Sequence, residues 1–177
     1  MAGKHAGLMN MLCVALEFES KEKAFYEKAV RTCPGKLGKE VFQMLLDEET
    51  DHEKGIRDIY ESMKSGQAWP ESCSLFDREL MDARAAFQKA AEKHRSEVQS
   101  DVGFSEALQI SIDFERESVK FYEEKRKTAG DPLEKKFLER MIKEEKGHHL
   151  LLLDMQYYFD DPQGYFMEKE HRGLDGA

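Results

Sequence analysis

Apolar residues recur along the chain at intervals of three, four and seven positions, which is the spacing of one face of an α-helix. The stretches that carry this pattern are rich in Glu, Lys, Ala, Leu and Met, all favourable helix formers. Short segments with proline or glycine separate them, such as Cys33-Pro34-Gly35 and Gly130-Asp131-Pro132. The pattern predicts helices at about 6–32, 36–65, 75–99, 105–129 and 132–159, followed by a short amphipathic tail over 160–177. The chain is therefore expected to be all-α.

The predicted helices contain an internal repeat. Leu16-Glu17-Phe18-Glu19 matches Ile112-Asp113-Phe114-Glu115, and Glu48-Glu49-x-x-His52 matches Glu144-Glu145-x-x-His148, both at a shift of 96 positions (115 − 19 and 148 − 52). A shift that stays constant through two helices and the turn between them indicates a duplicated helical hairpin. The two copies cover about 6–65 and about 105–159 of a single domain, 1–177, and the segment between them contains a further helix, about 75–99.

Six polar residues interrupt the apolar faces of these helices. In the second helix the apolar positions Phe42, Leu45, Ile56 and Ile59 lie on one face, and the same spacing requires further members at 49 and 52. The interrupting residues are Glu49 and His52 there, Glu145 and His148 in the last long helix, and Glu19 and Glu115 in the first helix of each pair. Four carboxylates and two imidazoles are therefore expected to point into the core.

Ionised carboxylates remain in an apolar interior only when they are paired or bind metal, because their removal from water costs several kcal/mol each. No lysine or arginine occupies these positions of the predicted core face. Two divalent ions would balance four glutamates, and two imidazoles would add neutral ligands. Ferritin-like di-iron and di-manganese bundles use this ligand set, with one Glu from each of two helices and Glu-x-x-His from each of two others. The pattern predicts a di-metal site, with a metal-free bundle that has lost this use as the alternative.

A third Glu-x-x-His motif, Glu168-x-x-His171, has no partner in the repeat. It follows Pro162, in the predicted tail. We interpret it as accidental or as a local packing feature.

Composition excludes several classes of protein. With 36% charged residues and a mean hydropathy of −0.71, the chain is too polar to span a bilayer. A net charge of −9 is the wrong sign for a sequence-independent nucleic-acid binder. Cys13, Cys33 and Cys73 are odd in number and widely spaced, so they form neither a disulfide framework nor a CxxC metal site. No signal peptide is visible at the N-terminus, and a cytoplasmic protein without nucleic-acid or membrane partners is expected.

The chain resembles the rubrerythrin family of ferritin-like proteins over essentially its whole length. The segments that carry the resemblance are Glu19-Ser20 to Phe25-Tyr26, both repeated Glu-x-x-His motifs, and the closing Tyr165–Glu168 and Gly173–Gly176 stretches. The resemblance implies a ferritin-like four-helix bundle, built from two repeated helical hairpins with a long crossover that contains an additional helix. It also implies two bound iron ions and the reduction of hydrogen peroxide or dioxygen in defence against oxidative stress. Manganese also suits this ligand set.

The resemblance also assigns roles to individual residues by matching positions. Glu49 and Glu145 would bridge the two metals, and Glu19 and Glu115 would each bind one. His52 and His148 would supply one nitrogen each. Tyr26 and Tyr122 would donate hydrogen bonds that orient the ligand carboxylates.

Two features depart from the family pattern. Full-length rubrerythrins carry a rubredoxin-like domain with paired CxxC motifs, and this sequence has none, so a separate rubredoxin-like protein or reductase is the expected electron donor. Rubrerythrins also place an extra Glu one turn after the third-helix ligand, where this chain has Ser118. Its repeat mate is Glu22, and we hypothesise that Glu22 is an additional metal ligand from the opposite hairpin. The alternative is a solvated surface glutamate.

Three further alternatives stay open at this stage. A ferritin-type ferroxidase or iron-storage protein would share the same ligands, and a purely structural bundle would bind no metal. The crossover helix has an apolar stripe that packs either on its own bundle or on a second subunit. A homodimer is expected from the superfamily, which commonly pairs bundles side by side.

Overall fold

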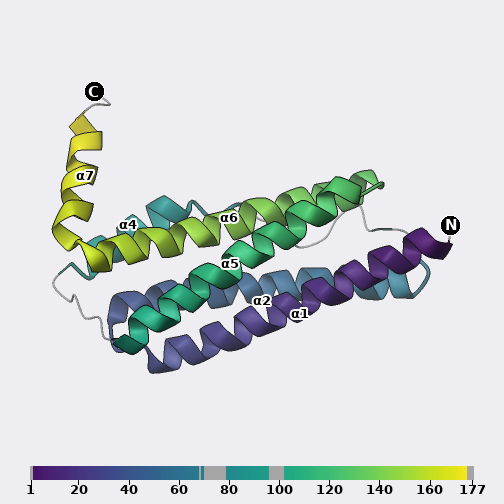
Figure 1. Ribbon diagram of the computed structural model, residues 1–177, viewed down its shortest axis with the longest axis horizontal. Helices are drawn as coiled ribbons and strands as arrows, with labels where there is room; N and C mark the ends of the chain where they lie inside the picture. Colours follow the sequence, from purple (N-terminus) through teal and green to yellow (C-terminus); the bar gives the residue numbers. More distant parts are fainter. Residues whose placement is uncertain (1, 68, 70–78, 96–101, 175–177) are drawn as a thin grey trace.

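The computed structural model describes residues 2–67, 69, 79–95 and 102–174, and every regular element within them is a helix. The helices are α1 (Ala2–Thr32), α2 (Lys36–Lys64), α4 (Ala83–Lys93), α5 (Val102–Thr128), α6 (Pro132–Asp160) and α7 (Pro162–Leu174). Figure 1 shows α1 and α2 as one antiparallel hairpin and α5 and α6 as a second, packed against the first. The four long helices form the predicted bundle.

Local sequence signals set the helix ends. Asp131 caps α6 by accepting hydrogen bonds from the backbone N–H groups of Leu133 and Glu134, and the Glu134 side chain reaches back to the cap. Pro132 opens the helix, where its missing N–H costs nothing. Gly66 follows α2 at a φ of +81°, a left-handed conformation that favours glycine.

Two apolar clusters flank the middle of the bundle. One contains Leu37, Phe42, Leu45, Leu152 and Met155. The other contains Leu12, Ile59, Met63, Leu138 and Met141. Because α2 and α6 each contribute to both clusters, the Glu-x-x-His motifs lie between the clusters, where water is excluded from both sides.

The crossover helix is shorter than predicted. Residues 79–82 are not helical, because α4 begins at Ala83 with Asp82 as its N-cap. The predicted ends, 75–78 and 96–99, lie outside the described residues. Phe87, Ala90 and Ala91 are fully buried, and α4 contacts α6 and α2. This helix therefore buries its apolar stripe on its own bundle.

The predicted tail begins with a helix, α7, which turns away from the end of α6 (Figure 1). Asp161 accepts a hydrogen bond from the N–H of Gly164 at the start of the helix. Tyr165 is buried with its ring 5.4 Å from those of both Phe87 and Tyr158. These aromatic contacts hold α7 against the bundle. None of the described helices combines the length and apolar character needed to cross a membrane.

Candidate metal centre

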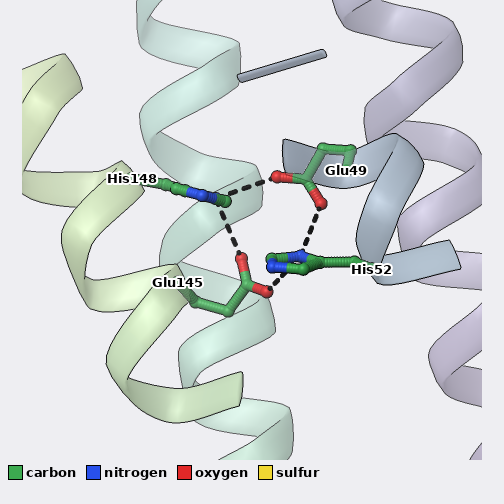
Figure 2. Close-up of side chains that lie close together, drawn as sticks. All are labelled: Glu49, His52, Glu145 and His148. Atoms are coloured by element: carbon green, nitrogen blue, oxygen red, sulfur yellow. Dashed lines mark hydrogen bonds and ion pairs between the residues drawn. The ribbon is translucent and has the colours of Figure 1, made fainter. Parts of the chain in front are cut away.

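The six residues predicted from the helix faces come together at the middle of the bundle. Each is at most 1% exposed, and they come from all four long helices. The set comprises Glu19 of α1, Glu49 and His52 of α2, Glu115 of α5, and Glu145 and His148 of α6. Figure 2 shows the two Glu-x-x-His motifs facing each other across the hairpins, with their side chains pointing inward.

One half of the centre surrounds His52. Its Nδ1 atom lies 3.2 Å from Glu19 Oε2, 3.1 Å from Glu49 Oε2 and 3.3 Å from Glu145 Oε1. We call the pair Glu19 and His52 half-site A.

The other half surrounds His148. Its Nδ1 atom lies 2.9 Å from Glu49 Oε1 and 3.5 Å from both Glu115 Oε2 and Glu145 Oε2. We call the pair Glu115 and His148 half-site B. Glu49 and Glu145 thus each direct one oxygen to half-site A and the other to half-site B. This is the arrangement that bridging carboxylates need.

Several buried atoms of the centre form no hydrogen bond of suitable geometry among the described residues, although Glu49 Oε1 and His148 Nδ1 lie within ion-pair distance of each other. They are Glu49 Oε1, Glu115 Oε2, both carboxylate oxygens of Glu145, and both ring nitrogens of His148. A buried acceptor without a donor is costly, and a cation satisfies it. The mixed oxygen and nitrogen donors suit divalent iron or manganese. The residues present therefore fit a pair of metal ions.

The pKa values of several buried groups are raised in the metal-free centre, so these groups tend to hold protons. Burial raises the pKa of Glu115 to about 8, although His148 opposes the shift. Burial and the charge of Glu145 raise the pKa of Glu19 well above its usual range. Burial disfavours the charged imidazole of His148, but the charge of Glu49 outweighs it and raises the pKa. Metal-free protein thus holds protons here, and metal binding would displace them.

The remaining carboxylates of the centre stay ionised. Burial favours the neutral form of Glu49, but the charges of His52 and His148 outweigh it and hold the pKa below its usual range. Burial and the charge of Glu49 favour the neutral form of Glu145 as well, but the imidazoles of His148 and His52 beside it outweigh them and lower its pKa.

Two tyrosines connect the hairpins at the centre. Tyr26 of α1 donates a hydrogen bond to Glu115 of α5, and Tyr122 of α5 donates one to Glu19 of α1. Burial, followed by the charge of the accepting carboxylate, raises the pKa of both tyrosines, so they remain neutral donors. Each fixes the orientation of one carboxylate in the opposite hairpin.

Glu22 is 1% exposed, so the alternative that it is a solvated surface residue is wrong. Ser118 Oγ donates a 2.6 Å hydrogen bond to Glu22 Oε1, while Glu22 Oε2 is buried with no hydrogen-bond partner in the described chain. Glu22 offers an oxygen within 4.8 Å of ligand oxygens on Glu19 and Glu49. Burial and the charge of Glu115 raise its pKa well above the usual range. Glu22 therefore lies beside the centre.

Sequence reasoning missed Glu144 and Arg140. Glu144 is 4% exposed, its Oε2 atom lies 2.9 Å from His52 Nε2, and its Oε1 atom accepts from Arg140. Arg140 and Glu144 are four residues apart, which is a usual spacing for ion pairs on a helix, so this pair could have been predicted from the sequence. In the third motif, Glu168 is exposed on α7, and the His171 side chain lies outside the described residues.

The helices and the donor set together define the class of ferritin-like di-metal carboxylate bundles. The family model described as Rubrerythrin matches residues 10–156, and the chain belongs to the rubrerythrin family. The predicted all-α ferritin-like fold and the family resemblance are thereby confirmed. No curated protein and no solved structure matches the chain.

Proposed function

We propose that this protein is a di-iron oxidoreductase that reduces hydrogen peroxide, or dioxygen, to water in defence against oxidative stress. The observation that carries the proposal is the pair Glu49 and Glu145, whose oxygens lie 2.9–3.5 Å from the Nδ1 atoms of two different histidines. A site that holds two metals close together binds both oxygens of a peroxide more readily than a single ion does.

Each residue of the centre has a proposed role. Glu49 and Glu145 would bridge the metals, and Glu19 with His52 and Glu115 with His148 would complete the two half-sites. Tyr26 and Tyr122 keep Glu115 and Glu19 oriented. The bound iron pair would supply the two electrons that peroxide reduction needs, one from each ion. Manganese in one or both positions is the alternative metal content.

Glu22 is proposed as an additional ligand from the first hairpin. It is buried beside Glu19 and Glu49, and Ser118 engages only one of its two carboxylate oxygens. Burial and then the charge of Glu115 raise its pKa in the metal-free protein.

We also propose partners for the centre. A rubredoxin-like protein or a reductase delivers the electrons. Leu150, Leu153 and Tyr157 share one face of α6 and are each more than a third exposed, which supports a homodimer. Cys13 and Cys33 are present as thiols, which fits a cytoplasmic location.

The test begins with anaerobic purification and metal analysis. We expect about two irons per chain. The ferrous protein is then mixed in a stopped-flow instrument with hydrogen peroxide or with oxygenated buffer, and oxidation is followed by absorbance. Faster oxidation by peroxide supports the proposal, and faster oxidation by dioxygen shifts the assignment to an oxidase. Protein that contains no metal and takes up none on titration contradicts the proposal.

Light scattering distinguishes the ferritin-like alternative. A ferroxidase that stores mineral needs a large hollow shell, whereas the proposed enzyme is expected at the mass of a dimer.

A further inference from the structure

The two histidines of the centre differ in the partner of their Nε2 atom, which lies on the side of the ring away from the other ligands. His52 Nε2 lies 2.9 Å from Glu144 Oε2. The other oxygen of Glu144, Oε1, accepts a hydrogen bond from Arg140 Nε at 2.7 Å and forms an ion pair with Nη2 at 2.5 Å. His148 Nε2 is also buried, but it has no hydrogen-bond partner in the described part of the chain.

The repeat explains this difference. A shift of 96 positions pairs Glu144 with Glu48 and Arg140 with Met44 (144 − 48 and 140 − 44). Met44 offers no cation that could anchor a carboxylate. Glu48 is half-buried, with an oxygen within 4.8 Å of a His52 ring nitrogen and of a Glu144 oxygen. The mirror image of the contact between Glu144 and His52 is therefore not formed at His148.

A carboxylate behind a metal-binding histidine has a known physical effect. It accepts the N–H of one ring nitrogen, fixes the tautomer and the ring orientation, and makes the other nitrogen a more basic ligand. Here the ligand nitrogen is Nδ1, which faces Glu19, Glu49 and Glu145. The rigid guanidinium of Arg140 in turn fixes Glu144.

We propose that Glu144, anchored by Arg140, is a positioning residue that makes half-site A bind metal more tightly than half-site B. The first metal ion then enters beside His52 and the second beside His148. The inference rests on the proposed di-metal function and goes beyond it, because the six ligands alone are of the same residue types in the two halves.

Glu48, His52 and Glu144 also form a group that could hold a third ion. Arg140 argues against this use, since its charge already balances Glu144 and occupies one of the carboxylate oxygens. The number of bound ions decides between the two uses.

The experiment titrates the full-length metal-free protein with Co²⁺ under anaerobic conditions, and the visible absorption of bound cobalt is recorded. The wild-type protein is expected to bind two ions in two resolved steps. Glu144→Ala should weaken the tighter step about 10- to 100-fold and leave the weaker step unchanged. Glu144→Gln, which keeps an acceptor, should restore part of the loss, and Arg140→Gln should fall between. Melting of each metal-free variant checks that the bundle folds.

Glu48→Ala is the matched control at the mirror position, and both steps should stay within about twofold of wild type. The inference is overturned by two equivalent ions in the wild type, by an unchanged tight step in Glu144→Ala, by an equal loss in Glu48→Ala, or by a third bound ion. A wild-type protein that binds no cobalt contradicts the di-metal function itself, so the two failures are distinguishable.

Discussion

The two hairpins of this bundle are copies of one unit, and their likeness and their differences have separate consequences. Tyr26 bonds to Glu115 and Tyr122 to Glu19, which is the same contact under the shift of 96. The ring contacts between Phe18 and Phe121 and between Phe25 and Phe114 correspond in the same way, at 5.1 and 5.5 Å. The likeness explains why two equivalent sets of ligands meet at the middle of the bundle.

Two of the differences between the hairpins lie at residues around those ligands. Position 22 carries Glu where position 118 carries Ser, and the two mates contact each other directly. Position 140 carries Arg where position 44 carries Met. The first hairpin therefore brings an extra carboxylate, whereas the second brings an anchored carboxylate behind His52. We therefore propose that the duplicated scaffold sets where two metals bind and that a few changed side chains make the two positions inequivalent.

Removing the metals tests the ligand set that the two hairpins share, and it should have the largest effect on stability. Without metal, the carboxylates from both hairpins lose the charge that balances them. At metal concentrations about 1,000 times Kd, binding stabilises the fold by about 4 kcal/mol. Chelation should therefore lower the Tm by about 8–16 °C in differential scanning calorimetry.

The double variant Glu49→Ala/Glu145→Ala is the control, because it lacks both bridging carboxylates. Its Tm should not respond to the chelator. An unchanged Tm in chelated wild-type protein would contradict the charge balance argued for the centre.

The pH dependence of the metal-free protein should have the next largest effect. Folded Glu115 has a pKa of about 8 against an ordinary value of 4.5, so the folded state keeps a proton that the unfolded state releases. Stability should therefore fall as pH rises from about 4.5 to about 8, by a few kcal/mol. The raised pKa values of His52 and His148 continue the decline above pH 6.5. Thermal melts at pH 5.5, 7 and 8.5 measure it.

Matched variants test whether one carboxylate from each hairpin causes this decline in stability with rising pH. Glu19→Gln and Glu115→Gln replace one carboxylate each, and both should flatten the dependence, because both pKa values are raised by burial. Holoprotein should lack the decline, since metal replaces the protons. A metal-free protein that becomes more stable between pH 5.5 and 8 would refute the assignment.

The features that the hairpins share could be predicted from the sequence. A carboxylate or imidazole at a regular position of an apolar helix face has only the core to point into, so Glu49 and His52 could be identified from spacing alone. The same spacing located Glu145 and His148 on α6, and the constant shift supplied Glu19 and Glu115. All six are buried at the middle of the bundle.

The features that were missed depend on contacts between distant segments. The ion pair with Arg140 could be read from spacing, but the contact of Glu144 with His52 could not, because His52 lies 92 positions away in the sequence. The end of the chain was interpreted as a tail because Pro162 breaks the pattern of α6. The burial of Tyr165 against Phe87 and Tyr158, which holds α7 in place, is a tertiary contact that periodicity does not report.

Replacing Tyr26 or Tyr122 should have a smaller effect on metal binding, and the effect should be equal for the two residues. Tyr26→Phe and Tyr122→Phe each remove one hydrogen bond to a buried carboxylate, an interaction worth about 1.5–3 kcal/mol when the acceptor is charged. Both variants should weaken metal binding to a similar extent in a Co²⁺ titration. The exposed Tyr157 provides a control, since Tyr157→Phe should leave the titration unchanged. A large effect from one tyrosine and none from the other would show that the hairpins do not share this contact.

The exchange between positions 22 and 118 is expected to have the smallest effect, and it acts on the chemistry more than on stability. Glu22→Ala removes the carboxylate proposed to serve the metals and should slow oxidation of the ferrous protein by peroxide about tenfold, or about 1.4 kcal/mol. Ser118→Ala removes only the 2.6 Å hydrogen bond to Glu22 and should change the rate by less. Stopped-flow absorbance measures both rates.

The double variant Glu22→Ser/Ser118→Glu moves the extra carboxylate to the second hairpin, where the family pattern has it. Because positions 22 and 118 contact each other across the repeat, the exchange keeps the hydrogen-bonding pair and changes only which hairpin supplies the carboxylate. The double variant should therefore recover much of the rate that Glu22→Ala loses. Unchanged peroxide kinetics in Glu22→Ala would remove Glu22 from the site. A double variant as slow as Glu22→Ala would instead show that the carboxylate acts only from the first hairpin, because the anchored His52 and the less constrained His148 make the two half-sites unequal.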